Sequence, residues 1–136
     1  MTSTSATTSA RPSTAGSGLL RAFQVFALLA ALNVLFQFVT AGQLFGRGEG
    51  PEGAHSAGAI VLHVFSGLAA IAAVLLWRQG GISIRLMVLA VVVFGYTFLQ
   101  AATGGRSSLY VHVPGAMLMT AGVVWLLVAA VRVRRA

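Results

Sequence analysis

Four long apolar runs alternate with short polar breaks along most of the chain. The runs cover residues 20–44, 56–77, 84–103 and 109–131. A helix needs about 20 predominantly apolar residues to cross a bilayer, and each run has this length to within a few residues. None of the runs is long enough for two crossings. The pattern therefore predicts an all-α protein with four transmembrane helices.

The breaks between the runs contain residues that stop apolar helices. They are Arg47, Glu49, Pro51 and Glu52 in the first break, Arg78, Gly80, Gly81 and Arg85 in the second, and Gly104, Gly105, Arg106 and Ser107 in the third. The N-terminal segment is different, since ten of its first 18 residues are Ser or Thr. Such a segment cannot bury a hydrophobic face. We therefore expect a disordered cytoplasmic tail over residues 1–18 and a four-helix transmembrane domain over residues 19–136.

A cleaved signal peptide is an alternative interpretation of the first run. The residues Val39, Thr40 and Ala41 include the small side chains that a cleavage site requires. However, the run is longer than the usual hydrophobic segment of about 7–15 residues, and it carries Asn33 and Gln37. These features favour a transmembrane helix that is retained.

The composition narrows the class of protein. Hydrophobic residues make up 57% of the chain and charged residues only 8%, whereas a soluble domain has about 25% charged residues. A chain without cysteine cannot form disulfides, thiolate catalytic sites or iron–sulfur clusters. The net charge is +7, but the nine basic residues flank the apolar runs and form no patch. The expected partner is therefore the lipid bilayer and not a nucleic acid.

The arginines are distributed unequally between the two sides of the predicted membrane protein. With the N-terminus inside, only Arg47 and Arg106 lie outside. The cytoplasmic arginines are Arg11, Arg21, Arg78, Arg85, Arg132, Arg134 and Arg135. Because basic residues concentrate on the cytoplasmic side, we expect a multi-pass membrane protein with both termini in the cytoplasm.

An internal repeat relates the two halves of the chain. Asn33, Gln37 and Gly42 in the first run match Tyr96, Gln100 and Gly105 in the third at identical spacing, and Leu62-His63-Val64 in the second run matches Val111-His112-Val113 in the fourth. Trp77 and Trp125 follow these histidines at similar distances. The repeat predicts two similar helical hairpins, each with a glutamine on its first helix and a histidine on its second.

Polar residues gather in the half of the bundle that the arginine rule places outside. They are Asn33, Gln37, Thr40, Gln43, His55, His63, Tyr96, Gln100, Thr103, Tyr110 and His112. Polar side chains are costly in hydrocarbon and face the interior of a helix bundle. The pattern predicts a site near the extracytoplasmic face.

The histidines are the only candidate chemistry in these runs. No Asp, Glu or Lys lies within a run, which excludes a carboxylate pair and argues against proton-coupled or sodium-coupled transport. Histidine is a common axial ligand of haem iron, and small residues beside His63 and His112 leave room for a flat macrocycle. We expect these two as the axial pair of a b-type haem. If the depth of each histidine in the membrane is measured from the arginines that flank the runs, His112 falls between His55 and His63. His55 therefore remains an alternative ligand.

Other residues would assist such a site. Gln37 and Gln100 are candidates for hydrogen bonds to the ligand histidines, and Arg106 or Arg47 for contacts with the haem propionates. The same residues also fit a structural interpretation. Small residues at this spacing are common where membrane helices pack, and a histidine within the membrane can simply bond to a glutamine.

Several short motifs resemble those of small, uncharacterised four-helix integral membrane proteins of actinobacteria. They are Gln37-x4-Gly42, His55-x2-Gly58, Leu62-His63, Gln100 and Val111-His112-Val113-Pro114-Gly115. The lysine-free composition, rich in Ala, Val, Gly and Arg, also fits a high-GC bacterium, so the resemblance implies the bacterial inner membrane as the location. More distantly, the duplicated hairpin is similar to four-helix b-type cytochromes and to halves of haem A synthase, which implies haem binding between histidines of neighbouring helices. Because no histidine lies in the inner half, at most one haem is implied.

Two functional hypotheses follow from the sequence. The first is a single-haem, b-type cytochrome-like protein in electron transfer or haem handling, with a membrane redox protein or a quinone as its partner. The second is a small membrane accessory or assembly protein that has no cofactor and no catalytic activity.

Overall fold

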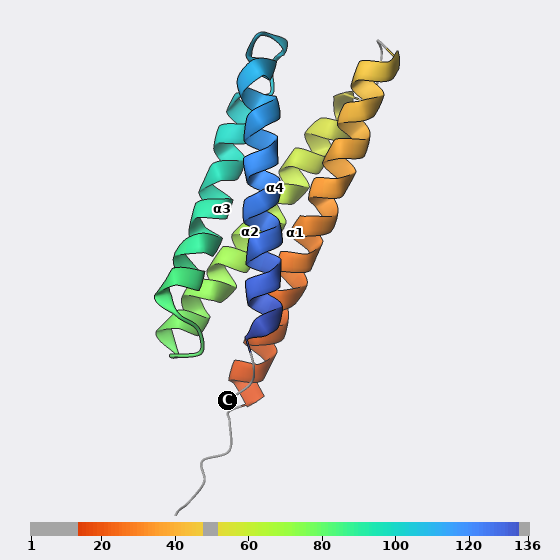
Figure 1. Cartoon of the computed structure of the whole chain (residues 1–136). Coiled ribbons are helices and arrows are strands. Elements are labelled where there is room, and N and C mark those ends of the chain that lie inside the picture. Colours follow the sequence, from red (N-terminus) through yellow and green to blue (C-terminus); the bar gives the residue numbers. More distant parts are fainter. Residues whose placement is uncertain (1–13, 48–51, 134–136) are drawn as a thin grey trace, which may run out of the picture.

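The computed structural model describes residues 14–47 and 52–133 of the chain. They form four long helices, α1 (Thr14–Arg47), α2 (Glu52–Arg78), α3 (Ile84–Ala102) and α4 (Leu109–Arg132), with a short 3₁₀ turn, η1 (Arg106–Ser108), before α4. Figure 1 shows these helices side by side in one bundle. The predicted four-helix architecture is confirmed.

Each helix packs against two others. Helix α1 lies between α2 and α4, and α3 also lies between α2 and α4, so that the bundle has α1 opposite α3 and α2 opposite α4. The end of α1, the start of α2 and the α3–α4 connection lie at one end of the bundle, and the α2–α3 turn lies at the other (Figure 1). We call the first the histidine end, since it carries His55 and His112, and the second the arginine end, since it carries Arg78, Arg85 and Arg132.

Small side chains form the centre of the bundle. Ala27 and Ala30 of α1, Ala73 of α2, Ala90 of α3 and Ala130 of α4 are completely buried. Such residues let helix backbones approach closely, as is typical of helices that pack in a membrane. Large aliphatic side chains instead lie on the outside, and all four helices are long and apolar enough to cross a bilayer. The chain is therefore an integral membrane protein whose outer surface contacts lipid.

Burial follows the same pattern in α1 and α3. Ala27, Ala30 and Val34 are buried in α1, and Ala90, Val93 and Thr97, each 63 residues later, are buried in α3. This shift also relates Gln37 to Gln100, as the sequence predicts.

The second helix of each hairpin has a different register from the predicted one. The buried residues Gly58, Leu62, Ser66, Ala69 and Ala73 of α2 correspond to Gly115, Met119, Val123, Leu126 and Ala130 of α4, each 57 residues later. This shift matches His55 with His112. The burial pattern therefore has a different register from the sequence match of His63 with His112 and of Trp77 with Trp125.

The ends of the helices follow local signals. Helix α2 stops at a Schellman motif, in which Gly81 N–H donates to the Leu76 carbonyl and Gly80 takes a positive φ of 73° that favours glycine. Residues 1–13 of the predicted tail lie outside the described residues. Residues 14–18, predicted as part of that tail, instead begin α1. With 34 residues α1 is about 51 Å long and extends beyond a hydrocarbon core of about 30 Å.

Candidate functional site

Two imidazole rings meet at the histidine end. His55 is the fourth residue of α2 and His112 is the fourth residue of α4. Their ring centres are 6.4 Å apart and their planes are inclined at 71°. Both side chains are half-buried. Because α2 and α4 are opposite each other in the bundle, the two rings approach across its middle.

The His112 ring is held through its Nδ1 atom. This nitrogen lies 3.0 Å from the backbone carbonyl oxygen of Gln100 on α3. A carbonyl oxygen only accepts, so Nδ1 must carry the hydrogen and donate it. In the neutral ring the other nitrogen, Nε2, then has a free lone pair. His112 is therefore oriented as a metal-ligating histidine is, with Nδ1–H bonded to a carbonyl.

His55 is held in a similar way by Thr40 of α1. The His55 Nδ1 atom lies 3.0 Å from Thr40 Oγ1. The same hydroxyl is 3.1 Å from the carbonyl oxygens of Phe36 and Gln37, which can only accept. We therefore assign the hydroxyl hydrogen to the helix backbone and the ring hydrogen to His55 Nδ1. With this assignment Nε2 of His55 also has a free lone pair.

A glycine follows each of these histidines after two residues, and each glycine packs under the glutamine of its own hairpin. A Cβ atom at Gly58 would lie 3.0 Å from Gln37 Oε1 and 2.9 Å from Phe36 Cε1. A Cβ atom at Gly115 would collide with Gln100 Nε2. Both glutamines therefore lie at the site. Gln100 reaches His112 through its backbone carbonyl, whereas the Gln37 side chain lies 3.4 Å from Thr40 Oγ1.

His63 has different surroundings. It lies eight residues after His55 on α2, and its ring packs edge to face on Phe98 of α3, with 4.5 Å between ring centres. Its Nδ1 atom is buried, and no hydrogen-bond partner for it is found among the described residues. The buried Oδ1 atom of Asn33 on α1 is in the same situation. The ring contact that the structure gives to His63 is therefore with an aromatic side chain, and not with His112.

The two arginines proposed for propionate contacts also belong to this end. Arg106, in η1, forms an ion pair of 3.6 Å with Glu52 at the start of α2, and both side chains are largely exposed. This contact links the two hairpins. Arg47 is the last residue of α1, and its side chain lies outside the described part of the structure.

The histidine pair is the strongest candidate for a ligand site. An imidazole nitrogen lies about 2 Å from a bound metal and the ring centre about 1 Å further, so two rings on opposite sides of one metal have centres about 6 Å apart. The 6.4 Å between His55 and His112 agrees with this value. Among residues 14–47 and 52–133, no group of three or more His, Cys, Asp or Glu side chains could hold a metal ion. The candidate ligands at this site are therefore the two histidines.

The sequence contains a further repeated motif at this site, beyond the glutamines and histidines. Gln37-x2-Thr40 and Gln100-x2-Thr103 repeat with the same 63-residue shift as the buried positions, and both threonine hydroxyls bond to carbonyls of their own helix. Together with His55-x2-Gly58 and His112-x2-Gly115, they define the repeated unit.

The chain matches no protein-family model, and no curated protein or solved structure is significantly similar to it.

Proposed function

We propose that this four-helix membrane protein binds one b-type haem between His55 and His112 and acts in electron transfer or haem handling. The observation that carries the proposal is the imidazole pair, with 6.4 Å between ring centres and both Nδ1 atoms hydrogen-bonded to the protein. A bound haem iron would supply one-electron redox chemistry, exchanged with a membrane redox protein or a quinone.

Each residue of the site has a definite part in this proposal. Nε2 of His55 and Nε2 of His112 would hold the iron, while Thr40 and the Gln100 carbonyl orient the rings and increase their basicity. Gly58 and Gly115 add no side chain beside the ligands. Arg106, which is exposed at the same end and paired with Glu52, would supply a positive charge to a propionate. His63, two turns further along α2, takes no part.

The charges of the chain support one orientation in the membrane. Arg21, Arg78, Arg85 and Arg132 lie at or near the helix ends opposite the histidine pair, and basic residues concentrate in the cytoplasm. We therefore propose that the histidine end faces the outside of a bacterial inner membrane and that both termini are cytoplasmic. A reporter fused after Arg135 that is active only outside the cell would contradict this orientation.

A second candidate function is that of an accessory protein without a cofactor. One observation favours this function. The glutamine side chains already fill the space beside Gly58 and Gly115, most tightly where Gln100 contacts Gly115. In this case His55 and His112 only connect helices. A macrocycle would have to displace these glutamines, so the two candidates make different predictions for haem binding.

An absorption spectrum of the full chain distinguishes the candidates. The protein, expressed with added haem and purified in mild detergent, should give a Soret band and sharp α and β bands on reduction. His55→Ala and His112→Ala should each abolish the low-spin signal. His63→Ala is the matched control, since it removes a histidine from the same helix as His55, and it should retain the signal. Circular dichroism identifies variants that have lost their helices, and for these the conservative His→Gln variant replaces His→Ala.

Each other outcome also has a definite meaning. A wild-type preparation that stays free of haem, although folded and supplied with haem, would contradict the proposal and support the accessory function. Loss of the signal in His63→Ala and His112→Ala, with its retention in His55→Ala, would show that the pair expected from the sequence is the axial pair.

A further inference from the structure

A groove with charged residues at one end runs between α3 and α4 at the arginine end. Its volume is about 720 Å³. The charged residues are Arg85, the second residue of α3, and Arg132, the last residue of α4. Leu89, Val92, Trp125 and Val128 line its apolar part. The groove is therefore cationic at the end of the helices and apolar further in.

Among the residues that the structure describes, no carboxylate side chain lies within reach of the arginines of this groove. Glu49 and Glu52 are the only acidic residues of the chain, and Glu52 lies at the histidine end, where it pairs with Arg106. Helix α3, with 19 residues, separates the two ends by about 28 Å. The N-terminus of α3 adds a partial positive charge beside Arg85. Within residues 14–47 and 52–133, no carboxylate pairs with Arg85 or Arg132, so both charges are available to an anion from another molecule.

The apolar part of the groove extends from the arginines into the membrane. Val92 and Trp125 are each seven residues from Arg85 and Arg132 respectively, which corresponds to about 10 Å along each helix. The Trp125 side chain is 69% exposed. Tryptophan is enriched at membrane–water interfaces, because its ring is apolar and its N–H is polar. The arrangement of charge and apolar surface matches that of a phospholipid, with its phosphate at the arginines and an acyl chain beside Trp125.

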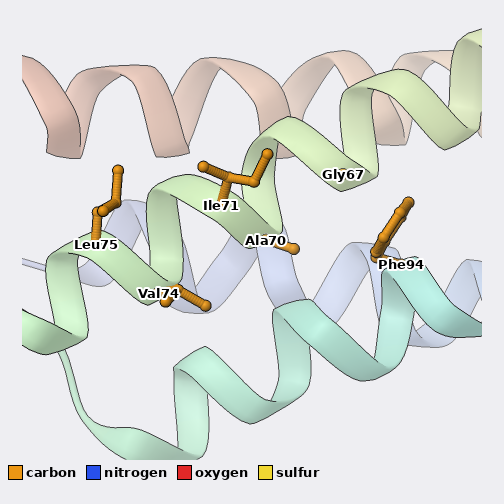
Figure 2. A pocket seen from close by; sticks show the side chains of 6 residues that line it. All are labelled: Gly67, Ala70, Ile71, Val74, Leu75 and Phe94. Atoms are coloured by element: carbon orange, nitrogen blue, oxygen red, sulfur yellow. The ribbon is translucent and has the colours of Figure 1, made fainter.

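The groove between α2 and α3 provides a comparison on the same bundle. Figure 2 shows its lining, Gly67, Ala70, Ile71, Val74, Leu75 and Phe94, which is entirely apolar. With a volume of about 270 Å³ it is also smaller. Such a surface can contact acyl chains but has no group that distinguishes one lipid headgroup from another. The α3–α4 groove differs because it contains two arginines. Of the two grooves, we therefore expect only the α3–α4 groove to distinguish lipids by the charge of their headgroups.

We propose that the α3–α4 groove binds an anionic phospholipid, with the phosphate between Arg85 and Arg132 and an acyl chain along Val92 and Trp125. Basic pockets between transmembrane helices bind anionic headgroups in this way. The site is independent of the histidine pair, because it lies at the opposite end of the bundle.

Quenching of Trp125 fluorescence by lipids with brominated acyl chains tests the proposal. The full chain carries Trp77→Phe, so that Trp125 is the only tryptophan. Brominated phosphatidylglycerol, titrated into mixed micelles, should quench at roughly 30-fold lower mole fraction than brominated phosphatidylcholine, as expected for two cations near a phosphate. The combined variant Arg85→Gln/Arg132→Gln should lose this preference.

A matched control separates the groove from the general charge of this end. Arg21→Gln/Arg78→Gln removes two exposed arginines near the same end that do not line the groove, and it should retain most of the preference. Equal quenching by the two lipids in the parent protein would overturn the proposal. An equal loss of preference in both double variants would also overturn it, since the attraction would then be a property of the whole surface. Circular dichroism verifies that each variant has the parent's helix content.

Discussion

The contact between Gly115 and Gln100 leads to a quantitative prediction about stability. Gly115 is buried in α4, and a Cβ atom there would collide with Gln100 Nε2 and lie 3.0 Å from the Tyr96 hydroxyl. Gly95 on α3 is the matched control, because a Cβ atom there has no neighbour within 4 Å. Gly115→Ala and Gly95→Ala are therefore the same chemical change in two different environments.

The magnitudes follow from two opposing effects. An alanine in a helix is more favourable than glycine by about 1 kcal/mol, and this benefit applies to both variants. Overpacking costs about 1–3 kcal/mol where neighbours cannot move freely, and this applies only at Gly115, since Gln100 is itself buried. We expect Gly95→Ala to stabilise the protein by up to about 1 kcal/mol. Gly115→Ala should be less stable than Gly95→Ala by about 1–3 kcal/mol.

Unfolding with a denaturing detergent, followed by circular dichroism in mixed micelles, measures these differences. The double variant Gly115→Ala/Gln100→Ala should recover much of the loss, because it removes the side chain with which the new methyl group collides. Gly58→Ala should cost less than Gly115→Ala, since the Phe36 ring that it meets is 45% exposed and can turn towards lipid. Equal stability of Gly115→Ala and Gly95→Ala, or no recovery in the double variant, would show that Gln100 does not pack on Gly115.

Three further predictions concern other parts of the molecule. Gln24→Leu removes the 3.0 Å hydrogen bond from Gln24 Nε2 to the Ala130 carbonyl. It should lower the free energy of unfolding by about 0.6–1.5 kcal/mol in the same assay. An unchanged free energy of unfolding would mean that this bond contributes nothing. Glu52→Gln breaks an exposed ion pair with Arg106 and should change stability by less than about 0.5 kcal/mol, and a larger loss at low salt would contradict that estimate. Because the apolar runs contain no Asp, Glu or Lys, proteoliposomes should show no uptake driven by a proton or sodium gradient; uptake that stops when the gradient is dissipated would refute this expectation.

The sequence was a good guide to the helices because the signals for a transmembrane helix are local. Length and hydropathy predicted spans 20–44, 56–77, 84–103 and 109–131, and the structure has helices over all four. The residue at which α1 begins was harder to predict from the sequence. Residues 14–18 are mostly small and polar, and such residues form the first turn of a helix only because a long apolar helix follows them.

It was harder to predict which histidine of α2 corresponds to His112 of α4, because matching apolar residues carry little information about how two helices align. Leu62-His63-Val64 resembles Val111-His112-Val113, but Leu and Val can face lipid at almost any position of a membrane helix. The close approach of helices depends instead on small residues, and here Gly58 and Gly115 are the ones that lie under a glutamine. The spacing His-x2-Gly was the informative signal, since it ties each histidine to the glycine beside it.

Symmetry explains why His55 meets His112 and why His63 has no such partner. Equivalent residues of two similar hairpins face each other when they lie close to the axis that relates the hairpins, and the buried positions of α2 and α4 make His55 and His112 equivalent. By the same 57-residue shift, the equivalent of His63 is Thr120, whose hydroxyl bonds to the Ala116 carbonyl of its own helix. The shift between α1 and α3 is 63 residues, so the six-residue difference falls in the connection between the glutamine and the histidine of each hairpin. Glutamine spacing alone therefore could not place the histidines, and only the packed helices bring the equivalent pair together.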